Sequence, residues 1–376
     1  MYRIHNPLLW LLLAGLTGLS CGGSRPVTQK EAASAPASLK TAFSQHFYIG
    51  TALGAQMFQG SDPRATRLIQ REFNAATPEN VMKSQVIHPE PGRYDFTQAD
   101  QFMAFAEAQQ LTVFGHTLIW HSQLSSFATK IQTADSMTRF MEDHIATVAG
   151  RYAGRIKGWD VVNEALEEDG SMRPSVFYKT LGEDYVAMAF KMAQKADPKA
   201  ELYYNDYNIE QPKKREGAIR LIKKIQASGA RIDGVGIQGH WSLQGAPIEE
   251  IEAAIVAFSQ LGVKVMFTEL DITVLPNPWD LKGADVNQNF EGSPFMNPYP
   301  QALPDSVQQQ LADRYEALFR LFVKHADKID RVTFWGVDDG HSWLNNWPIR
   351  GRTNYPLLFD RAYEPKAAYH RVMGVK

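Results

Sequence analysis

The chain has 376 residues, enough for one large barrel or for two to three smaller domains. It is 44% hydrophobic and 11% aromatic, which is ample for a sizeable core. The formal net charge of −2 offers no attraction for a polyanion, so no nucleic-acid partner is expected. Cys21 is the only cysteine, which excludes disulfides and thiolate metal sites from the rest of the chain.

The first twenty residues have the pattern of an export signal. Arg3 and the amino terminus supply positive charge, and the apolar run from Leu8 to Leu19 is too short to span a bilayer comfortably. The segment ends just before Cys21 and resembles a bacterial lipoprotein signal that is cleaved there, leaving the lipid on Cys21. Gly18 departs from that pattern, since Leu is usual at this place, and a plain signal peptide is the alternative. We expect an exported lipoprotein anchored in the outer membrane, on its periplasmic or cell-surface face.

Residues 21–38 are rich in Ala, Ser, Gly, Pro and Gln and predict a flexible tether. From residue 39 onward, a strand pattern followed by a helix pattern recurs eight times. Strands are predicted at 47–53, 73–78, 112–120, 156–163, 202–207, 235–241, 264–272 and 331–337. Helices are predicted at 62–71, 97–110, 135–151, 175–196, 212–228, 247–261, 305–328 and 365–373.

This alternation predicts an α/β fold, a (β/α)8 TIM barrel that forms a single catalytic domain over residues 39–376. A doubly wound open sheet is the alternative, but the chain has no glycine-rich phosphate loop. No cofactor is therefore predicted.

Polar residues follow almost every predicted strand. The carboxyl ends of parallel strands meet on one face of a barrel, where the chemistry of this fold takes place. A lone glutamate is more often a solvated loop residue, and a lone histidine or tryptophan more often packs in the core. Polar residues at nearly all of the strand ends at once, however, indicate a shared site. The set is Glu79, Asn80, Lys83, His116, Trp120, His121, Gln123, Asn163, Glu164, Asn205, Asp206, Tyr207, Gln238, His240, Glu269, Asp271, Trp335 and Trp343.

Two of these residues, Glu164 and Glu269, end buried strands of similar design, Trp159–Asn163 and Val265–Thr268. Cleavage of a glycosidic bond needs a proton donor on one side and an anion on the other. Burial raises the pKa of a carboxyl group and suits a donor, whereas a hydrogen-bonded environment that includes His240 and Asp271 would keep Glu269 ionised.

The remaining strand-end groups suit sugar binding. Asn163 could bond a sugar 2-hydroxyl, and Trp335 and Trp343 offer flat faces to sugar rings. Pairs of sugar hydroxyls need both hydrogen-bond donors and acceptors, and these are offered by Glu79, Asn80, Lys83 and Gln123.

Seven stretches resemble the endo-1,4-β-xylanases of glycoside hydrolase family 10, in the same order along the chain. They are 77–80, 115–123, 159–165, 204–208, 236–240, 268–272 and 334–337. The resemblance implies a retaining mechanism, with Glu164 as acid/base and Glu269 as nucleophile, acting on xylan and xylo-oligosaccharides. It also implies sugar subsites lined by Glu79, Asn80, Lys83, His116, Trp120, Gln123, Asn163, Gln238, His240, Trp335 and Trp343, and we add Tyr207 to this set.

One departure is the segment 276–304, which is longer than the family usually carries and lies beside the nucleophile. It can alter specificity on the leaving-group side, but loops tolerate length, so a variable surface insertion is favoured.

Three other functions are alternatives to a xylanase. A surface glycan-binding lipoprotein would bind without turnover, which the presence of both glutamates disfavours. A metal-dependent hydrolase would draw ligands from His116, His121, His240 and Asp271, but the family pattern gives these residues other roles, so no metal is predicted. A β-glucanase of similar fold would differ in its substrate alone. Near-neutral charge and a single barrel fit a monomer.

Overall fold

The structure is a computed structural model that describes residues 38–60 and 62–375. The predicted signal segment, Cys21 and the predicted tether up to residue 37 lie outside the described residues. Within the described part, no helix is long and apolar enough to cross a membrane.

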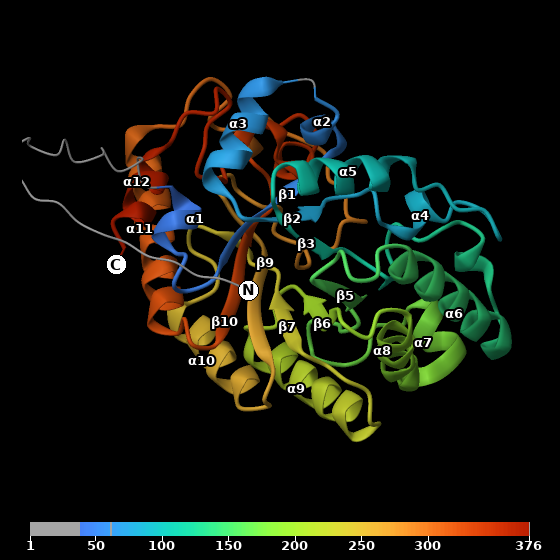
Figure 1. The fold of residues 1–376 in the computed structure, drawn as a ribbon. Helices are drawn as coiled ribbons and strands as arrows, with labels where there is room; N and C mark the ends of the chain where they lie inside the picture. Colours follow the sequence, from blue (N-terminus) through green and yellow to red (C-terminus); the bar gives the residue numbers. More distant parts are fainter. Residues whose placement is uncertain (1–37, 61, 376) are drawn as a thin grey trace, which may run out of the picture. The chain divides into compact units, whose positions relative to one another are not determined.

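Eight parallel strands close into a ring, which confirms the predicted (β/α)8 barrel (Figure 1). The last strand closes the ring because it pairs on one side with the first strand, where Arg331 lies opposite Tyr48, and on the other side with the strand that precedes it in the sequence. The ring consists, in order, of β1 (Tyr48–Leu53), β2 (Ala75–Pro78), β3 (Thr112–Gly115), β5 (Gly158–Asn163), β6 (Glu201–Asp206), β7 (Gly234–Ile237), β9 (Lys264–Thr273) and β10 (Ile329–Phe334).

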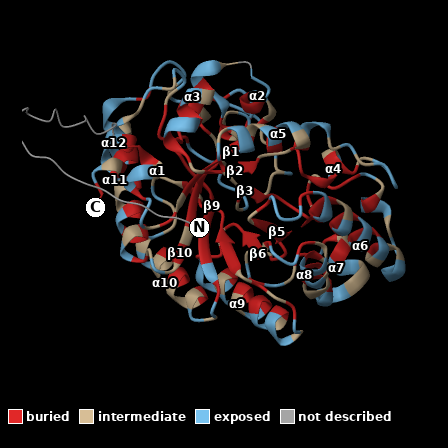
Figure 2. Cartoon of the chain, viewed as in Figure 1, coloured by how far each residue is buried: buried red, intermediate tan, exposed pale blue. Residues whose placement is uncertain are grey.

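A longer helix follows each strand of the ring and packs outside it. These helices are α3 (Pro63–Glu72), α5 (Thr97–Ala108), α6 (Ala134–Arg151), α8 (Tyr185–Ala196), α9 (Pro212–Ala227), α10 (Ile248–Ser259), α11 (Asp305–Lys324) and α12 (Ala367–Met373). Figure 2 shows buried strands inside and helices whose outer faces are exposed. Local signals explain individual starts: the Asp62 carboxylate accepts a hydrogen bond from the Arg64 N–H, and Pro63 opens α3.

Glycines with left-handed backbone divide two predicted elements. Gly182 (φ 67°) ends α7 (Val176–Leu181) before α8, so the predicted helix 175–196 is two helices. Gly239 (φ 81°) ends the sixth strand, and β8 (His240–Ser242) then pairs with β9 separately. Such φ values carry little cost only for glycine.

The predicted strand 112–120 is also wrong in detail, because β3 stops at Gly115 and β4 (Ile119–Trp120) pairs again with β5. Three short helices were not predicted. They are α1 (Leu39–Ala42), α2 (Ala55–Phe58) and α4 (Ser84–Ile87).

The core has two layers. The larger lies between the sheet and the helices, and a smaller cluster of Ala75, Phe114, Tyr203 and Met266 fills the barrel interior. Gly158 makes room there, since a Cβ at this position would lie 2.4 Å from the Tyr203 ring. The barrel is thus a packed solid whose carboxyl-terminal face is free to carry a site.

Candidate active site

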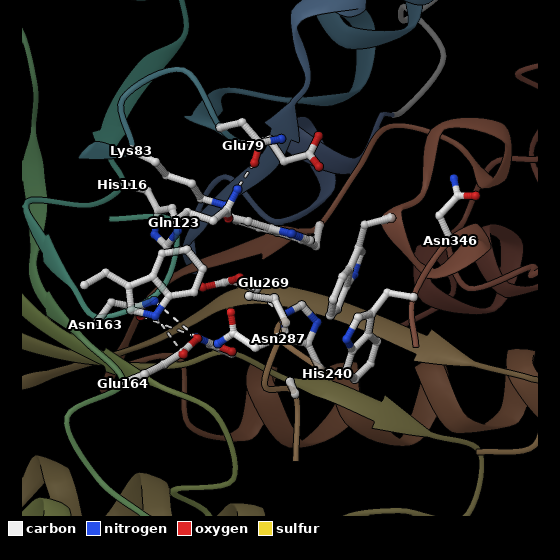
Figure 3. Close-up of a pocket in the computed structure, with 18 residues that line it drawn as sticks. Glu79, Lys83, His116, Gln123, Asn163, Glu164, His240, Glu269, Asn287 and Asn346 are labelled. Carbon is white, nitrogen blue, oxygen red and sulfur yellow. Dashed lines mark hydrogen bonds and ion pairs between the residues drawn. The ribbon is translucent and has the colours of Figure 1, made fainter. Parts of the chain in front are cut away.

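The carboxyl ends of the strands surround a pocket of about 400 Å³ (Figure 3). Both strand-end glutamates line it, together with every predicted sugar-contacting residue except Tyr207. The predicted residues that line it are Glu79, Asn80, Lys83, His116, Trp120, Gln123, Asn163, Glu164, Gln238, His240, Glu269, Trp335 and Trp343. A volume of this size is in the range of small-molecule sites.

Hydrogen bonds to both the backbone and the carboxylate of Glu164 hold this residue in place at the end of β5. Its backbone has φ 56°, its N–H donates to the Asn205 carbonyl (2.9 Å), and its carbonyl accepts from Arg173 Nε (3.1 Å). One carboxylate oxygen accepts from Trp120 Nε1 (2.7 Å) and the other from Gln238 Nε2 (2.9 Å). A left-handed glutamate is a strained conformation that the surroundings must hold.

The environment of Glu164 favours its protonated form. Burial, followed by the nearby Asp206 carboxylate, raises the pKa of Glu164 to about 7, and the hydrogen bonds from Gln238 and Trp120 only partly oppose this. The group can therefore give up and take back a proton near neutrality.

Glu269 has the opposite environment. Burial opposes its ionisation, but the hydrogen bond from His240 and the charge of His116 outweigh burial, and the pKa of Glu269 lies below its ordinary value. One oxygen accepts from Asn205 Nδ2 (2.7 Å) and the other lies 3.2 Å from His240 Nε2. The surroundings therefore shift the pKa values of the two glutamates in opposite directions.

His240 gains its charge from Asp271. Burial lowers the pKa of His240, but the Asp271 carboxylate, 2.9 Å from Nδ1, raises it to about 10. Trp343 Nε1 donates to the second oxygen of Asp271 (2.7 Å). At neutral pH, an imidazolium thus stands between the carboxylates of Asp271 and Glu269.

Asn205 links the two glutamates. Its Nδ2 donates to Glu269 and also to Asn163 Oδ1 (2.9 Å), and Asn163 Nδ2 reaches Glu164 at 3.3 Å. The absence of a side chain at Gly236 leaves room for the Asn205 amide, because a Cβ at position 236 would lie 2.3 Å from Asn205 Oδ1. The side-chain amides of Asn205 and Asn163, called the amide row, therefore fix the positions of the two carboxyl groups relative to each other.

A second polar group lies at the ends of β2 and β4. Lys83 Nζ donates to Gln123 Oε1 (2.8 Å) and Asn80 Oδ1 (3.0 Å) and stands 4.9 Å from the Trp120 ring centroid. Burial raises the pKa of Glu79 and lowers that of Lys83, and their mutual attraction opposes both shifts. These groups offer both donors and acceptors to a polyhydroxylated ligand.

Aromatic rings complete the walls. Trp343 stacks on Trp347 with centroids 4.5 Å apart, and Trp335 meets the edge of His116 at 5.3 Å. His116 is held from within the barrel by Asp160 (3.0 Å), a partner that sequence reasoning missed.

Tyr207, predicted as a sugar contact, is not among the residues that line this pocket. Its hydroxyl accepts from Arg173 (2.6 Å), its ring lies 3.6 Å below Lys214 Nζ, and its edge is covered by Gly283, where a Cβ would come within 2.4 Å. Tyr207 is therefore packed beneath the segment that follows β9.

That segment, residues 276–304 and named the strap, reaches the pocket. Ala284, Val286 and Asn287 line the pocket, as do Asn346 and Trp347 beyond β10. Sequence reasoning missed all five because they lie on irregular segments, where no periodicity shows which side chains point inward.

The four residues that a metal site would draw on have other partners or positions. His116 and His240 are bonded to Asp160 and Asp271, and burial lowers the pKa of His121 to about 4. In the described part of the chain, no three His, Cys, Asp or Glu side chains are grouped as metal ligands would be.

Fold and pocket together are those of a glycoside hydrolase barrel with a carboxyl pair. The description of glycosyl hydrolase family 10 matches residues 38–375, and the chain belongs to this family. Endo-1,4-beta-xylanase A of Xylanibacter ruminicola is 43% identical over 341 residues, covering 89% of this chain and 92% of its own.

Solved structures show the same fold. A GH10 endoxylanase retrieved from sugarcane soil metagenome superposes with a TM-score of 0.87 at 46% identity, covering 90% of this chain and all of its own. Xylanase XynB from Paenibacillus barcinonensis superposes with a TM-score of 0.81 at 36% identity, covering 92% of this chain and all of its own.

Proposed function

We propose that this chain is an endo-1,4-β-xylanase that hydrolyses internal β-1,4-xylosidic linkages of xylan with retention of anomeric configuration. The observation that carries the proposal is the carboxyl pair of Glu164 and Glu269 in one pocket, where the surroundings raise the pKa of Glu164 and lower that of Glu269. The names of the relatives, xylanases that match this chain over most of its length, support xylan as the substrate.

In the proposed mechanism, Glu269 attacks the anomeric carbon and forms a glycosyl ester. Glu164 gives its proton to the glycosidic oxygen as that bond breaks. Glu164, now ionised, takes a proton from water, whose oxygen displaces Glu269 from the anomeric carbon. Both steps invert that carbon, so the product retains the configuration, and both glutamates return to their first state.

The other pocket residues position the sugar. Asn163, between Asn205 and Glu164, can bond a 2-hydroxyl close to the anomeric centre. Glu79, Asn80, Lys83, Gln123 and Gln238 bond other hydroxyls, and His116, Trp120, Trp335 and Trp343 enclose the apolar faces.

The test measures release of reducing ends from soluble xylan and from a mixed-linkage β-glucan. We expect turnover of xylan, an initial fall in viscosity typical of internal cleavage, and a much lower kcat/KM on the glucan. The Glu269→Ala variant should lose turnover by several orders of magnitude while it stays folded. The Glu142→Ala variant, at an exposed position, is the matched control. Binding without turnover in the wild-type protein would support the glycan-binding rival instead.

We further propose that Cys21 carries a lipid that anchors the exported enzyme, as a monomer, in the outer membrane. Support comes from the signal-like residues 1–20 and from the position of the only cysteine directly after them. The Cys21→Ser variant should move from the membrane fraction to the soluble fraction. Unchanged fractionation would reject the lipid, and a light-scattering mass of two chains would reject the monomer.

A further inference from the structure

The strap crosses the mouth of the barrel. It starts after β9, yet Asn287 Nδ2 donates to Ser122 Oγ (2.6 Å) just beyond β4, 165 positions away in the sequence. In the ring, β5, β6 and β7 lie between these two anchor points. Gly283 lies against Tyr207 at the end of β6, so the strap covers this part of the mouth.

Several bonds hold the strap in this position. The Phe290 N–H donates to the Pro348 carbonyl (3.0 Å), and Arg352 Nη1 donates to the Pro276 carbonyl (2.9 Å). Within the strap, Gln288 bonds the backbone of Lys282 in both directions, at 2.7 and 2.8 Å. The strap is therefore a built wall of the pocket.

The wall stands on the side of the proton donor. Asp285 lies 3.7 Å from Arg173, the residue that bonds both the Glu164 carbonyl and the Tyr207 hydroxyl. The polar group of Glu79 and Lys83 faces both glutamates, since the charges of Glu269 and of Glu164 both raise the pKa of Lys83 against the effect of burial. A leaving sugar that takes the Glu164 proton departs on the side of that carboxyl group, which is the side of the strap.

We propose that the strap is a specificity element that closes the leaving-group side of the cleft. A long xylan chain has to displace or bend around Ala284, Val286 and Asn287, whereas a short leaving group does not. The enzyme therefore cleaves internal linkages in both, but with a higher kcat/KM in short xylo-oligosaccharides than in long xylan chains. This inference rests on the proposed xylanase function.

The test compares kcat/KM on long soluble xylan with kcat/KM on an aryl β-xylobioside, whose leaving group is small. The Asn287→Ala and Asp285→Ala variants each remove one anchor of the strap. We expect the ratio of the two constants, long xylan over aryl glycoside, to rise by roughly tenfold when both anchors are removed. Asn289→Ala and Asp280→Ala are the matched controls, because both are exposed positions of the same strap, and they should leave the ratio unchanged.

Turnover with an unchanged ratio in the doubly substituted protein overturns the strap proposal and leaves the xylanase function standing. No turnover of either substrate by the wild-type protein overturns both. Should the double variant fail to fold, the single variants are compared instead, and an equal ratio in both of them and in their controls counts against the strap.

Discussion

At the scale of single residues, the site is defined by two glutamates whose surroundings differ. Glu164 is buried near Asp206 and accepts hydrogen bonds from neutral donors, whereas Glu269 is next to a charged histidine. Desolvation acts on both, so the sign of the neighbouring charge decides which carboxyl keeps its proton. This difference is the reason for proposing Glu164 as the donor and Glu269 as the nucleophile.

The pH profile of kcat/KM should reflect these two groups. Activity needs Glu164 protonated, so it should fall as the pH rises through about 7. Activity needs Glu269 ionised, so the acidic limb should lie below the ordinary glutamate range. A basic limb far above 7 or an acidic limb near neutrality would contradict the assignment.

Trp120→Phe should move the basic limb to higher pH. The lost indole N–H stabilises ionised Glu164, so its removal raises the pKa of that group. A hydrogen bond to a charged group is worth roughly 1.5–3 kcal/mol, so we expect about one pH unit or somewhat more. Trp335→Phe, in the same pocket, should leave the limb in place. An unmoved limb in Trp120→Phe would show that this bond does not set the pKa.

At the scale of elements, strand pairing brings the charges together. The short strand β8 pairs with β9 so that His240 faces Asp271, two residues beyond Glu269. The break at Gly239 allows this separate pairing. The chemistry of Glu269 therefore depends on where one strand stops and the next begins.

Asp271→Asn tests that dependence. Without the carboxylate, the pKa of His240 falls, and an uncharged His240 stabilises ionised Glu269 less well. The pKa of Glu269 then rises, and the acidic limb of kcat/KM should move up by roughly 1–3 pH units. The basic limb, set by Glu164, serves as the internal control. A variant with an unmoved acidic limb would separate Asp271 from the tuning of Glu269.

Gly236→Ala tests the packing of β7 against the amide row. The added Cβ would displace Asn205, which positions Glu269, so kcat should fall. Because of the crowding, the free energy of unfolding should decrease by about 1–3 kcal/mol. Gly150→Ala, in α6, has open space around the new Cβ and should be neutral or slightly stabilising. Full activity in Gly236→Ala would mean that Asn205 has room to shift.

At the scale of the whole molecule, the closed barrel collects strand ends that are far apart in the sequence. This is why the polar residues after each strand could be predicted to converge. Tyr207 shows the limit of that rule, since a strand-end position does not tell whether another segment covers the side chain. The inward residues of the strap depend on a path over the barrel mouth that no local pattern encodes. The split at Gly182 was missed because a glycine within a helical pattern is compatible with both continuation and a left-handed stop.

The barrel also carries a pair of buried histidines away from the pocket. His88 and His144 approach to 3.2 Å, and each has an Nε2 atom without a partner among the described residues. Burial lowers the pKa of His144 to about 3 and also lowers that of His88. Folding therefore keeps both rings neutral where an unfolded chain would bind protons.

Stability should consequently fall as the pH drops below the unfolded histidine pKa of about 6.5, at up to about 1.4 kcal/mol per pH unit for each ring. This loss continues until the folded pKa is reached, near 3 for His144. Urea unfolding of His144→Gln between pH 4 and 8 should show a shallower pH dependence than the wild-type protein. Parallel curves for the two proteins would mean that this pair does not control acid stability.

The most direct measurement of the central claim, that Glu269 is the nucleophile in a two-step retaining reaction, is a trapping experiment. A 2-deoxy-2-fluoro-xylobioside with a dinitrophenyl leaving group slows the second step, and mass spectrometry of the digested protein locates the label. The account predicts one glycosyl unit per chain, attached to the peptide that contains Glu269. A label on another residue, or an enzyme that turns over xylan but acquires no label, would contradict it.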